Sequence, residues 1–179
     1  MRIWLLGLIV CITCPLFSQN GKIAFKGTVS FTSEAPLEII EASSSHLTGI
    51  MDTLTRKFAF SVKLTTFEGF NSALQKEHFH ENYMESTLFP TLQYSGTLLD
   101  VPDLRKNGSQ SVRTKGIFQI HGIKKERILN HKIVVRNGLI QIESAFTLRL
   151  SDYDISIPKI VDKKIAEEVA IKVVASNKS

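Results

Sequence analysis

The chain has 179 residues, two cysteines and a formal net charge of +5 at pH 7. This length suffices for one domain with its own hydrophobic core and is short for two. The Lys and Arg residues are dispersed, with no basic block, which argues against a nucleic-acid-binding protein and predicts no nucleic-acid partner.

The first residues have the pattern of a secretory signal peptide. A basic residue precedes the apolar run Ile3 to Cys14, which is too short to span a bilayer, and Pro15 breaks that run before the small residue Ser18. We therefore expect residues 1–18 to be a signal peptide and residues 19–179 to form one exported domain, periplasmic or secreted.

Both cysteines, Cys11 and Cys14, fall inside this segment. The mature chain is therefore expected to contain no disulfide and to depend on its core for stability. A lipoprotein signal is disfavoured because Val10 and Thr13, rather than small residues, precede the two cysteines. No later apolar run is long enough to span a bilayer, so we predict no stable membrane span.

The next part of the chain alternates apolar and polar residues, the period of a half-buried strand. Ile23 to Phe31 and Arg56 to Thr66 alternate clearly. Leu37 to Ser45 fits a strand or a short helix, and its neighbours favour a strand, whereas Leu47 to Leu54 is weakly patterned. The apolar faces of the two clear strands include Phe25, Gly27, Val29, Phe58 and Phe60.

An irregular, aromatic-rich segment of about thirty residues follows, from Phe67 to Gly96. Gly69 and Asn71 break the preceding strand pattern, and Pro90 fixes the chain before alternation resumes. A connection this long usually covers a site or folds on its own. We expect its aromatic side chains to cover the open end of a β-structure as a lid, with its charged groups in water.

Alternation then returns in five runs: Leu92 to Leu98, Val112 to Ile120, Arg127 to Arg136, Leu139 to Leu150 and Val169 to Ala175. Asn137-Gly138 is a strong hairpin signal, because both residues adopt positive φ readily. His121-Gly122 is a second candidate for a tight turn. The stretch before the last strand is expected to contain a helical turn near Lys163 to Glu168.

Eight strands with short connections predict an all-β, mostly antiparallel protein, either a sandwich or a barrel. Closure into a barrel removes exposed edges, and the interior of an eight-stranded barrel is either filled or able to hold one small ligand. Several expected inward positions are small, namely Gly27, Gly96, Gly116 and Ala145. They either leave room for a cavity or mark bends in the sheet, and the pattern alone favours bends.

Several short segments, taken in order, carry a family resemblance. They are His78-Phe79, Phe89-Pro90 with Gly96, the run Gly116 to Gly122, and Arg149 with Asp152 and Tyr153. Together they resemble the YceI-like family of exported lipid-binding proteins, and the resemblance covers the whole expected mature chain. It implies an extended, antiparallel, eight-stranded lipocalin-like barrel with a helical or irregular lid segment. It also implies a binding protein rather than an enzyme, with a polyisoprenoid lipid of the isoprenoid quinone or prenyl phosphate type in an apolar cavity.

A long isoprenoid tail can bind through apolar area alone, since burial gains about 25 cal/mol per Å², so few polar contacts are needed. The residues expected to line the cavity are Phe25, Val29, Phe58, Phe60, Phe118, Ile142, Phe146 and Leu148. Those expected around its mouth are Phe67, Phe70, Phe79 and Tyr83. Ordinary core packing is the alternative for each of them. Apart from this lipid no cofactor is predicted, and pairing of two chains as a homodimer stays open.

An enzyme is the alternative hypothesis. His78 and His80 are two residues apart, so in a strand they would share a face and could join Glu77 or Glu81 as metal ligands. A small exported hydrolase or metal-dependent enzyme would use His78, His80 and Glu81. No third ligand has suitable spacing, so we predict no metal site and no catalytic residue. A protein-interaction barrel with a filled core is a third reading.

Three other polar groups receive structural predictions. The run Ser43 to His46 places hydroxyls beside an imidazole, but the chain contains no G-x-S-x-G. His121 is expected to bond a turn backbone. Arg149 and Asp152 are expected to form a structural ion pair at a strand end, with a contact to a ligand head group as the alternative.

Overall fold

The computed structural model describes residues 21–177, so the predicted signal peptide lies outside the described residues. Within 21–177, no helix is both long and apolar enough to cross a bilayer. The elements are β1 (Lys22–Glu34), β2 (Ile39–Asp52), β3 (Lys57–Lys63), η1 (Leu64–Thr66), α1 (Ala73–His78), η2 (Phe79–Tyr83), β4 (Thr91–Leu98), β5 (Gly108–Ile120), β6 (Ile123–Arg136), β7 (Leu139–Arg149), η3 (Leu150–Tyr153), η4 (Lys159–Val161) and β8 (Glu168–Ser176).

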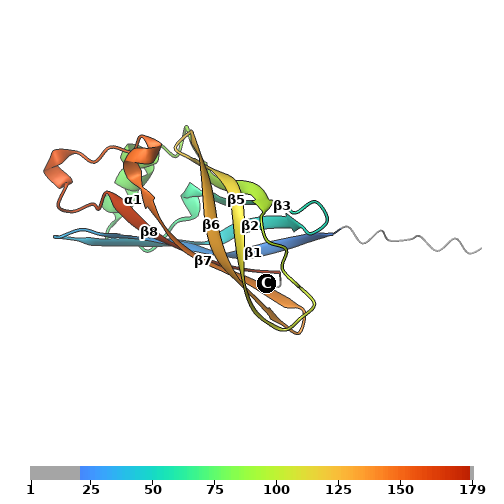
Figure 1. Ribbon diagram of the computed structural model, residues 1–179. Helices are drawn as coiled ribbons and strands as arrows, with labels where there is room; N and C mark the ends of the chain where they lie inside the picture. The colour runs from blue at the N-terminus through green and yellow to red at the C-terminus, as the bar shows by residue number, and fades with distance from the viewer. Residues whose placement is uncertain (1–20, 178–179) are drawn as a thin grey trace, which may run out of the picture.

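The eight strands close into one antiparallel barrel. Each strand pairs with the next in sequence, and β8 pairs with β1 to complete the ring. The predicted all-β, eight-stranded antiparallel barrel is therefore confirmed. Figure 1 shows α1 and the orange-red turn η4 near one end of the barrel, opposite the end at which β1 begins.

Two tight turns join β5 to β6 and β6 to β7. Asn137 and Gly138, between β6 and β7, have φ of 50° and 81°. His121 and Gly122, between β5 and β6, have φ of 49° and 74°. Two successive positive φ values give a turn whose twist matches that of its strands. The predicted hairpin at Asn137-Gly138 is confirmed, and His121 adopts the left-handed conformation although it is not glycine.

A β-bulge explains the weak sequence pattern of β2. The register passes from Gly27↔Leu47 to Val29↔Ser44, so β2 uses three residues where β1 uses two. Side chains alternate along a strand, so the extra residue shifts the inward positions of β2. They are even-numbered up to Ser44 and odd-numbered from Leu47 onward. The two segments that the sequence pattern separated therefore form one strand.

The connection between η1 and β4, residues 67–90, covers the barrel end and is called the lid below. Its helix α1 begins after Ser72, whose Oγ accepts a hydrogen bond from the backbone N–H of Gln75 at 3.1 Å. The helix continues directly into η2, a π-helical turn. The predicted lid is thus partly helical and partly irregular.

The strand ladder between β6 and β7 is incomplete. These strands pair only between residues 132–136 and 139–143. Beyond that point side chains connect them: His131 Nδ1 lies 2.5 Å from Ser144 Oγ, and Arg127 Nη2 donates to the carbonyl oxygen of Thr147 at 3.1 Å. We call this line of separation the β6–β7 seam.

The half of the barrel where β1 begins has a solid interior. Its buried side chains include Phe25, Met51, Phe58, Val112, Ile133 and Val135. Gly96 and Gly116 face each other on β4 and β5, and a Cβ at Gly96 would lie 2.1 Å from the carbonyl oxygen of Lys115. These glycines therefore permit close backbone approach instead of widening a cavity.

Two local expectations are wrong. The helical turn expected near Lys163 to Glu168 lies earlier: η4 covers Lys159–Val161, and the backbone N–H groups of Lys164 and Ile165 donate to the carbonyl oxygen of Val161. Ala145 was expected to face inward, but its side chain is exposed, and the neighbouring Ser144 faces the interior instead. The alternation of β7 runs through the even-numbered residues, from Ile140 to Leu148.

Candidate functional site

A cavity of about 520 Å³ occupies the other half of the barrel, beneath the lid. This volume falls within the range of small-molecule sites, about 300–1,000 Å³, and far exceeds the space that one water needs. The wall consists mainly of apolar side chains from the strands, such as Val29, Leu129 and Ile171. The lid and η4 contribute Leu74 and Val161, so the cavity extends to the barrel end that they cover.

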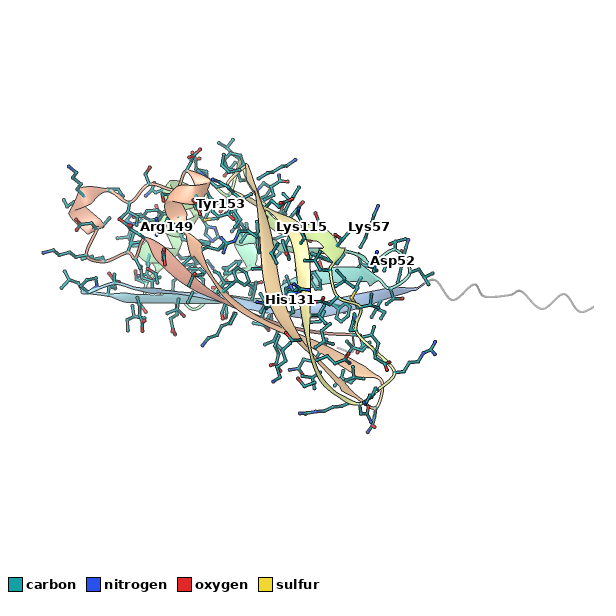
Figure 2. The ribbon with its side chains drawn as sticks, in the orientation of Figure 1. Asp52, Lys57, Lys115, His131, Arg149 and Tyr153 are labelled. Atoms are coloured by element: carbon teal, nitrogen blue, oxygen red, sulfur yellow. The ribbon has the colours of Figure 1, made fainter. Side chains whose placement is uncertain are left out.

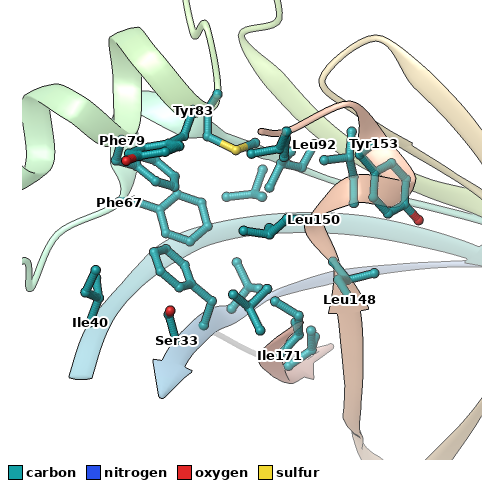
Figure 3. A pocket seen from close by; sticks show the side chains of 18 of the residues that line it. Ser33, Ile40, Phe67, Phe79, Tyr83, Leu92, Leu148, Leu150, Tyr153 and Ile171 are labelled. Atoms are coloured by element: carbon teal, nitrogen blue, oxygen red, sulfur yellow. The ribbon is translucent and has the colours of Figure 1, made fainter. Parts of the chain in front are cut away.

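Four phenylalanines form a cluster at the mouth of the cavity, and we call them the mouth cluster: Phe31, Phe67, Phe70 and Phe79. Phe79 stacks on Phe31 of β1 with ring centroids 5.4 Å apart and an angle of 15° between the rings. Its centroid lies 5.8 Å from that of Phe67 and 5.0 Å from that of Phe70. In Figure 3, Phe67, Phe79 and Tyr83 border one side of the pocket, with Ile171 and Leu148 across from them. The mouth cluster therefore holds the lid against the barrel through aromatic contacts.

Hydrogen bonds attach the lid to the rim of β2. The backbone groups of Glu68 and Ser43 exchange two hydrogen bonds, of 2.8 and 2.9 Å. Gln75 Nε2 donates to Glu38 Oε1 at 2.9 Å, and Asn71 Nδ2 donates to the carbonyl oxygen of Ile39 at 3.0 Å. These bonds lie beside the region in which β2 is not paired with β3, so the lid covers that gap.

His121 attaches the other end of the lid. Its Nε2 lies 2.7 Å from Glu85 Oε2 in the lid, and its Nδ1 lies 3.0 Å from the carbonyl oxygen of Tyr153 in η3. The ring of Phe89 meets the imidazole edge-on, with centroids 4.9 Å apart. His121 bonds a backbone carbonyl as expected, although that carbonyl belongs to η3 and not to its own turn. Its contact with Glu85 was not predicted.

The structure places ten of the twelve predicted contact residues on the cavity wall: Val29, Phe60, Phe67, Phe70, Phe79, Tyr83, Phe118, Ile142, Phe146 and Leu148. The other two, Phe25 and Phe58, are buried in the solid half. The ring centroid of Phe25 lies 5.9 Å from that of Phe60, and that of Phe58 lies 4.9 Å from that of Tyr94. Phe25 and Phe58 therefore pack behind the wall. Contact between any of the twelve and a ligand stays a prediction.

Four hydrogen-bonded polar side chains lie at the inner end of the cavity, and we call them the polar array: Tyr94, Thr114, His131 and Ser144. Thr114 Oγ1 lies 2.8 Å from Tyr94 Oη and 2.7 Å from His131 Nε2, while His131 Nδ1 contacts Ser144 Oγ. Tyr94, His131 and Ser144 line the cavity. Burial lowers the pKa of His131 to about 4 and raises the pKa of Tyr94. This array was not predicted from the sequence, in which its signal is one polar residue at an inward position of each of β4, β5, β6 and β7.

The residues of the metal-enzyme hypothesis do not form a site. His78 and His80 lie in α1 and η2, so the expectation that they share a strand face is wrong. His80 Nδ1 lies 2.9 Å from Ser86 Oγ, and burial lowers the pKa of His80. Among residues 21–177, no group of three or more His, Cys, Asp or Glu side chains could hold a metal ion. Glu81 is exposed, and the structure gives this hypothesis no assembled centre.

The remaining polar predictions also have structural outcomes. Arg149 donates to Glu168 Oε1 at 2.7 and 3.1 Å, so its ion-pair partner is Glu168 and not Asp152. The pair lies at the strand end, as expected, and is exposed. In the Ser43 to His46 run, Ser44 Oγ is 2.6 Å from Thr66 Oγ1 and accepts from the backbone N–H of His46. Its hydroxyl therefore has structural partners.

Known proteins share this architecture. A protein-family model described as the YceI-like domain matches residues 18–176. Among solved structures, a polyisoprenoid binding domain from Saccharophagus degradans, implicated in plant cell wall breakdown, superposes with a TM-score of 0.73 at 11% identity, covering 86% of this chain and 97% of that chain.

Two further solved structures are similar. BcnA from Burkholderia cenocepacia has a TM-score of 0.69 at 11% identity, covering 84% of this chain and 95% of that chain. A YceI protein from Campylobacter jejuni has a TM-score of 0.59 at 11% identity, covering 76% and 83% respectively. At this identity the likeness shows a common fold. A search of curated proteins finds no match.

Proposed function

The chain belongs to the YceI-like domain family, and from this premise we propose that it is an exported binding protein which holds a polyisoprenoid lipid in its barrel cavity. The observation that carries the proposal is the apolar cavity of about 520 Å³ beneath the mouth cluster. The similar barrel from Saccharophagus degradans is described as polyisoprenoid binding, which supports the same ligand class for this chain.

The physical basis is burial of an elongated apolar ligand. Each Å² of apolar surface removed from water contributes about 25 cal/mol, so a prenyl tail along the cavity needs few directional contacts. The mouth cluster adds aromatic surface where the tail would enter. We therefore propose that the cavity binds and releases a lipid without changing it chemically.

Export is the second part of the proposal. Residues 1–18 have the charge and apolar pattern of a signal peptide, and the family match begins at residue 18. We propose that the protein works in the periplasm or outside the cell. N-terminal sequencing of protein from the extracytoplasmic fraction should begin near Gln19, whereas intact chains confined to the cytoplasm would contradict export.

Mass spectrometry of an organic extract from natively purified protein tests ligand binding. The wild type should yield a lipid of isoprenoid mass. Ile171→Trp, which adds bulk to the cavity wall, should reduce the lipid recovered per protein by about tenfold or more, because the tail and the indole would compete for one volume. Recovery is normalised to folded protein measured by circular dichroism.

Val174→Trp is the matched control, because Val174 lies on the same strand and is 47% exposed. This variant should retain the lipid of the wild type. If the wild type yields no isoprenoid lipid and does not take up a prenyl lipid added in detergent, the proposed function is wrong. Equal lipid content in the two tryptophan variants would place the binding site elsewhere.

A further inference from the structure

The polar array lies near the inner end of the cavity, and on β7 and β8 the lining reaches one inward position beyond it, to Ile142 and Ala175. On β6 the lining reaches His131, whereas the next inward residue, Ile133, is buried in the solid half. On β4 the lining likewise reaches Tyr94 and does not include Leu98. Figure 2 shows His131 near the middle of the barrel, away from Arg149 and Tyr153 at the lid end. A ligand that fills the cavity would therefore place one of its ends against the array.

The hydrogen bonds of the array can all be donated in one direction, from Ser144 toward His131 Nδ1 and from His131 Nε2 through Thr114 and Tyr94 to Arg127. The carbonyl oxygen of Arg127 can only accept, so Tyr94 Oη donates to it, at 3.4 Å. Thr114 then donates to Tyr94, and His131 Nε2–H donates to Thr114. His131 Nδ1 is left as an acceptor for the hydroxyl of Ser144. In this arrangement Ser144 Oγ can accept a hydrogen bond from a ligand hydroxyl.

The hydrogen bonds among these four side chains can also all be donated in the opposite direction. Tyr94 donates to Thr114, Thr114 donates to His131 Nε2, and His131 Nδ1–H donates to Ser144. The reversal gives up only the 3.4 Å bond to Arg127, the longest in the array and a weak one. The hydroxyl proton of Ser144 is then free to donate to a ligand carbonyl. One set of side chains can thus serve either a donor or an acceptor.

Among the side chains that line the cavity, charge near the array is low. Lys132, Glu143 and Lys172 lie outside it, around a second, more open pocket that shares His131 and Ser144, and Lys132 is paired with Glu143. His131 is neutral at pH 7, since burial lowers its pKa to about 4. The charged residues of the lining, Glu38 and Lys164, lie at the lid end, where Glu38 bonds Gln75 of α1.

Arg127 is the charged residue whose field acts on Tyr94. Its guanidinium donates to the carbonyl oxygen of Thr147 across the β6–β7 seam and does not line the cavity. A phosphate at the array would lose its hydration without a counter-charge in contact.

From this geometry we propose that the polar array is a specificity subsite, which receives an uncharged hydrogen-bonding group of the lipid, a carbonyl or a hydroxyl, at the inner end of the cavity. The proposal rests on the function proposed above and adds the orientation and head-group class of the ligand. The polar end of the lipid lies inward against Ser144 and Tyr94, and the prenyl tail extends toward the mouth cluster. A prenyl diphosphate is disfavoured in this orientation.

The test compares four ligands with one tail: geranylgeraniol, a naphthoquinone with a geranylgeranyl side chain, geranylgeranyl diphosphate, and the matching hydrocarbon without a head group. Affinities of delipidated wild-type protein are measured by displacement of a fluorescent apolar probe. The alcohol and the quinone should bind about 3- to 10-fold tighter than the hydrocarbon, the gain expected from one hydrogen bond. The diphosphate should bind more weakly than either.

Ser144→Ala and Tyr94→Phe each remove one hydroxyl from the array. Both should lose about 3- to 10-fold in affinity for the alcohol or the quinone and should bind the hydrocarbon as the wild type does, which also reports that they are folded. Thr97→Val is the control: it removes a hydroxyl from the exposed face of β4 and should leave all four affinities unchanged.

The outcomes separate this inference from the proposed function. Equal affinity of the wild type for the hydrocarbon and the two uncharged polar ligands would overturn the subsite, as would a diphosphate that binds as tightly as the quinone. Variants that weaken all ligands equally would show a structural role for the array and would also overturn it. If no prenyl ligand binds the wild type, the proposed function itself fails.

Discussion

His131 is a buried imidazole on the inward face of a mostly apolar barrel. Both ring nitrogens have hydroxyl partners, Thr114 and Ser144, and burial lowers the pKa of the ring to about 4. Without its hydrogen bonds, a polar ring at this position would cost more than an apolar one. Ordinary packing of a hydrophobic core therefore does not explain why polar side chains occupy these inward positions.

The titration of His131 predicts acid sensitivity of the fold. Its folded pKa of about 4 lies below the ordinary value of 6.5, so the unfolded chain binds more protons between these two values. The contribution of His131 to stability is therefore constant above pH 6.5 and falls as the pH drops toward 4, by roughly 3 kcal/mol in total. Urea unfolding of the wild type at a series of pH values measures the fall.

His131→Gln, which cannot titrate, is the comparison. The difference in unfolding free energy between wild type and variant should change across the window from pH 6.5 to 4 and stay constant above it. His80, whose pKa is also lowered, is present in both proteins and cancels in this difference. A difference that does not vary with pH would show that His131 is not buried as a neutral group.

Residue patterns predicted the cavity wall well and its inner end poorly. Alternation identifies inward side chains, and this placed Val29, Phe118 and Ile142 on the wall. It does not tell how far along the barrel a side chain lies, so Phe25 and Phe58 were grouped with them although they pack in the solid half. An isolated polar residue on an apolar face carries little signal, and for this reason the polar array was not foreseen.

The lid is held at two ends by different kinds of contact. The mouth cluster and the β2 rim hold α1 and η2, whereas Glu85 and Phe89 contact His121 in the β5–β6 turn. Opening of the lid requires at least one of these attachments to separate. Within the described residues, the lid makes one ion-pair contact and one ring contact at the His121 end, fewer than the aromatic contacts of the mouth cluster, so this end is the weaker attachment.

We predict that His121→Ala speeds ligand release. The substitution removes the bonds to Glu85 and to the Tyr153 carbonyl, so the lid should open more often, and release of a fluorescent prenyl probe should become about 3- to 10-fold faster. Stopped-flow dilution measures the rate. His46→Ala, at an exposed histidine of β2, should release the probe at the wild-type rate. Identical release rates in all three proteins would exclude a gating role for this attachment.

Elements with uninterrupted alternation were predicted well. The hairpin at Asn137-Gly138 and the strands that flank it follow directly from local signals. β2 was divided in two because its bulge reverses the pattern midway. The lid helix was not located because α1 has only six residues and no buried side chain, too short to show an amphipathic period.

At the scale of the whole molecule, the barrel is solid at one end and hollow at the other. Eight alternating segments, most of them joined by short connections, predict antiparallel strands in a sandwich or a barrel. The family resemblance, and not the pattern, implied the barrel. The volume of the interior does not follow, because it depends on how side chains from all the strands meet. The aromatic contacts of Phe58 with Phe60 and Tyr94 fill one half, whereas the other half retains about 520 Å³.

The most direct test of the central claim is a crystal structure of the protein purified from its host under conditions that retain bound lipid. We predict continuous, elongated density within the cavity, from the mouth cluster at Phe79 to the polar array at His131, with the wall side chains in contact along its length. An interior closed by collapsed side chains, or occupied only by ordered water, would contradict the account.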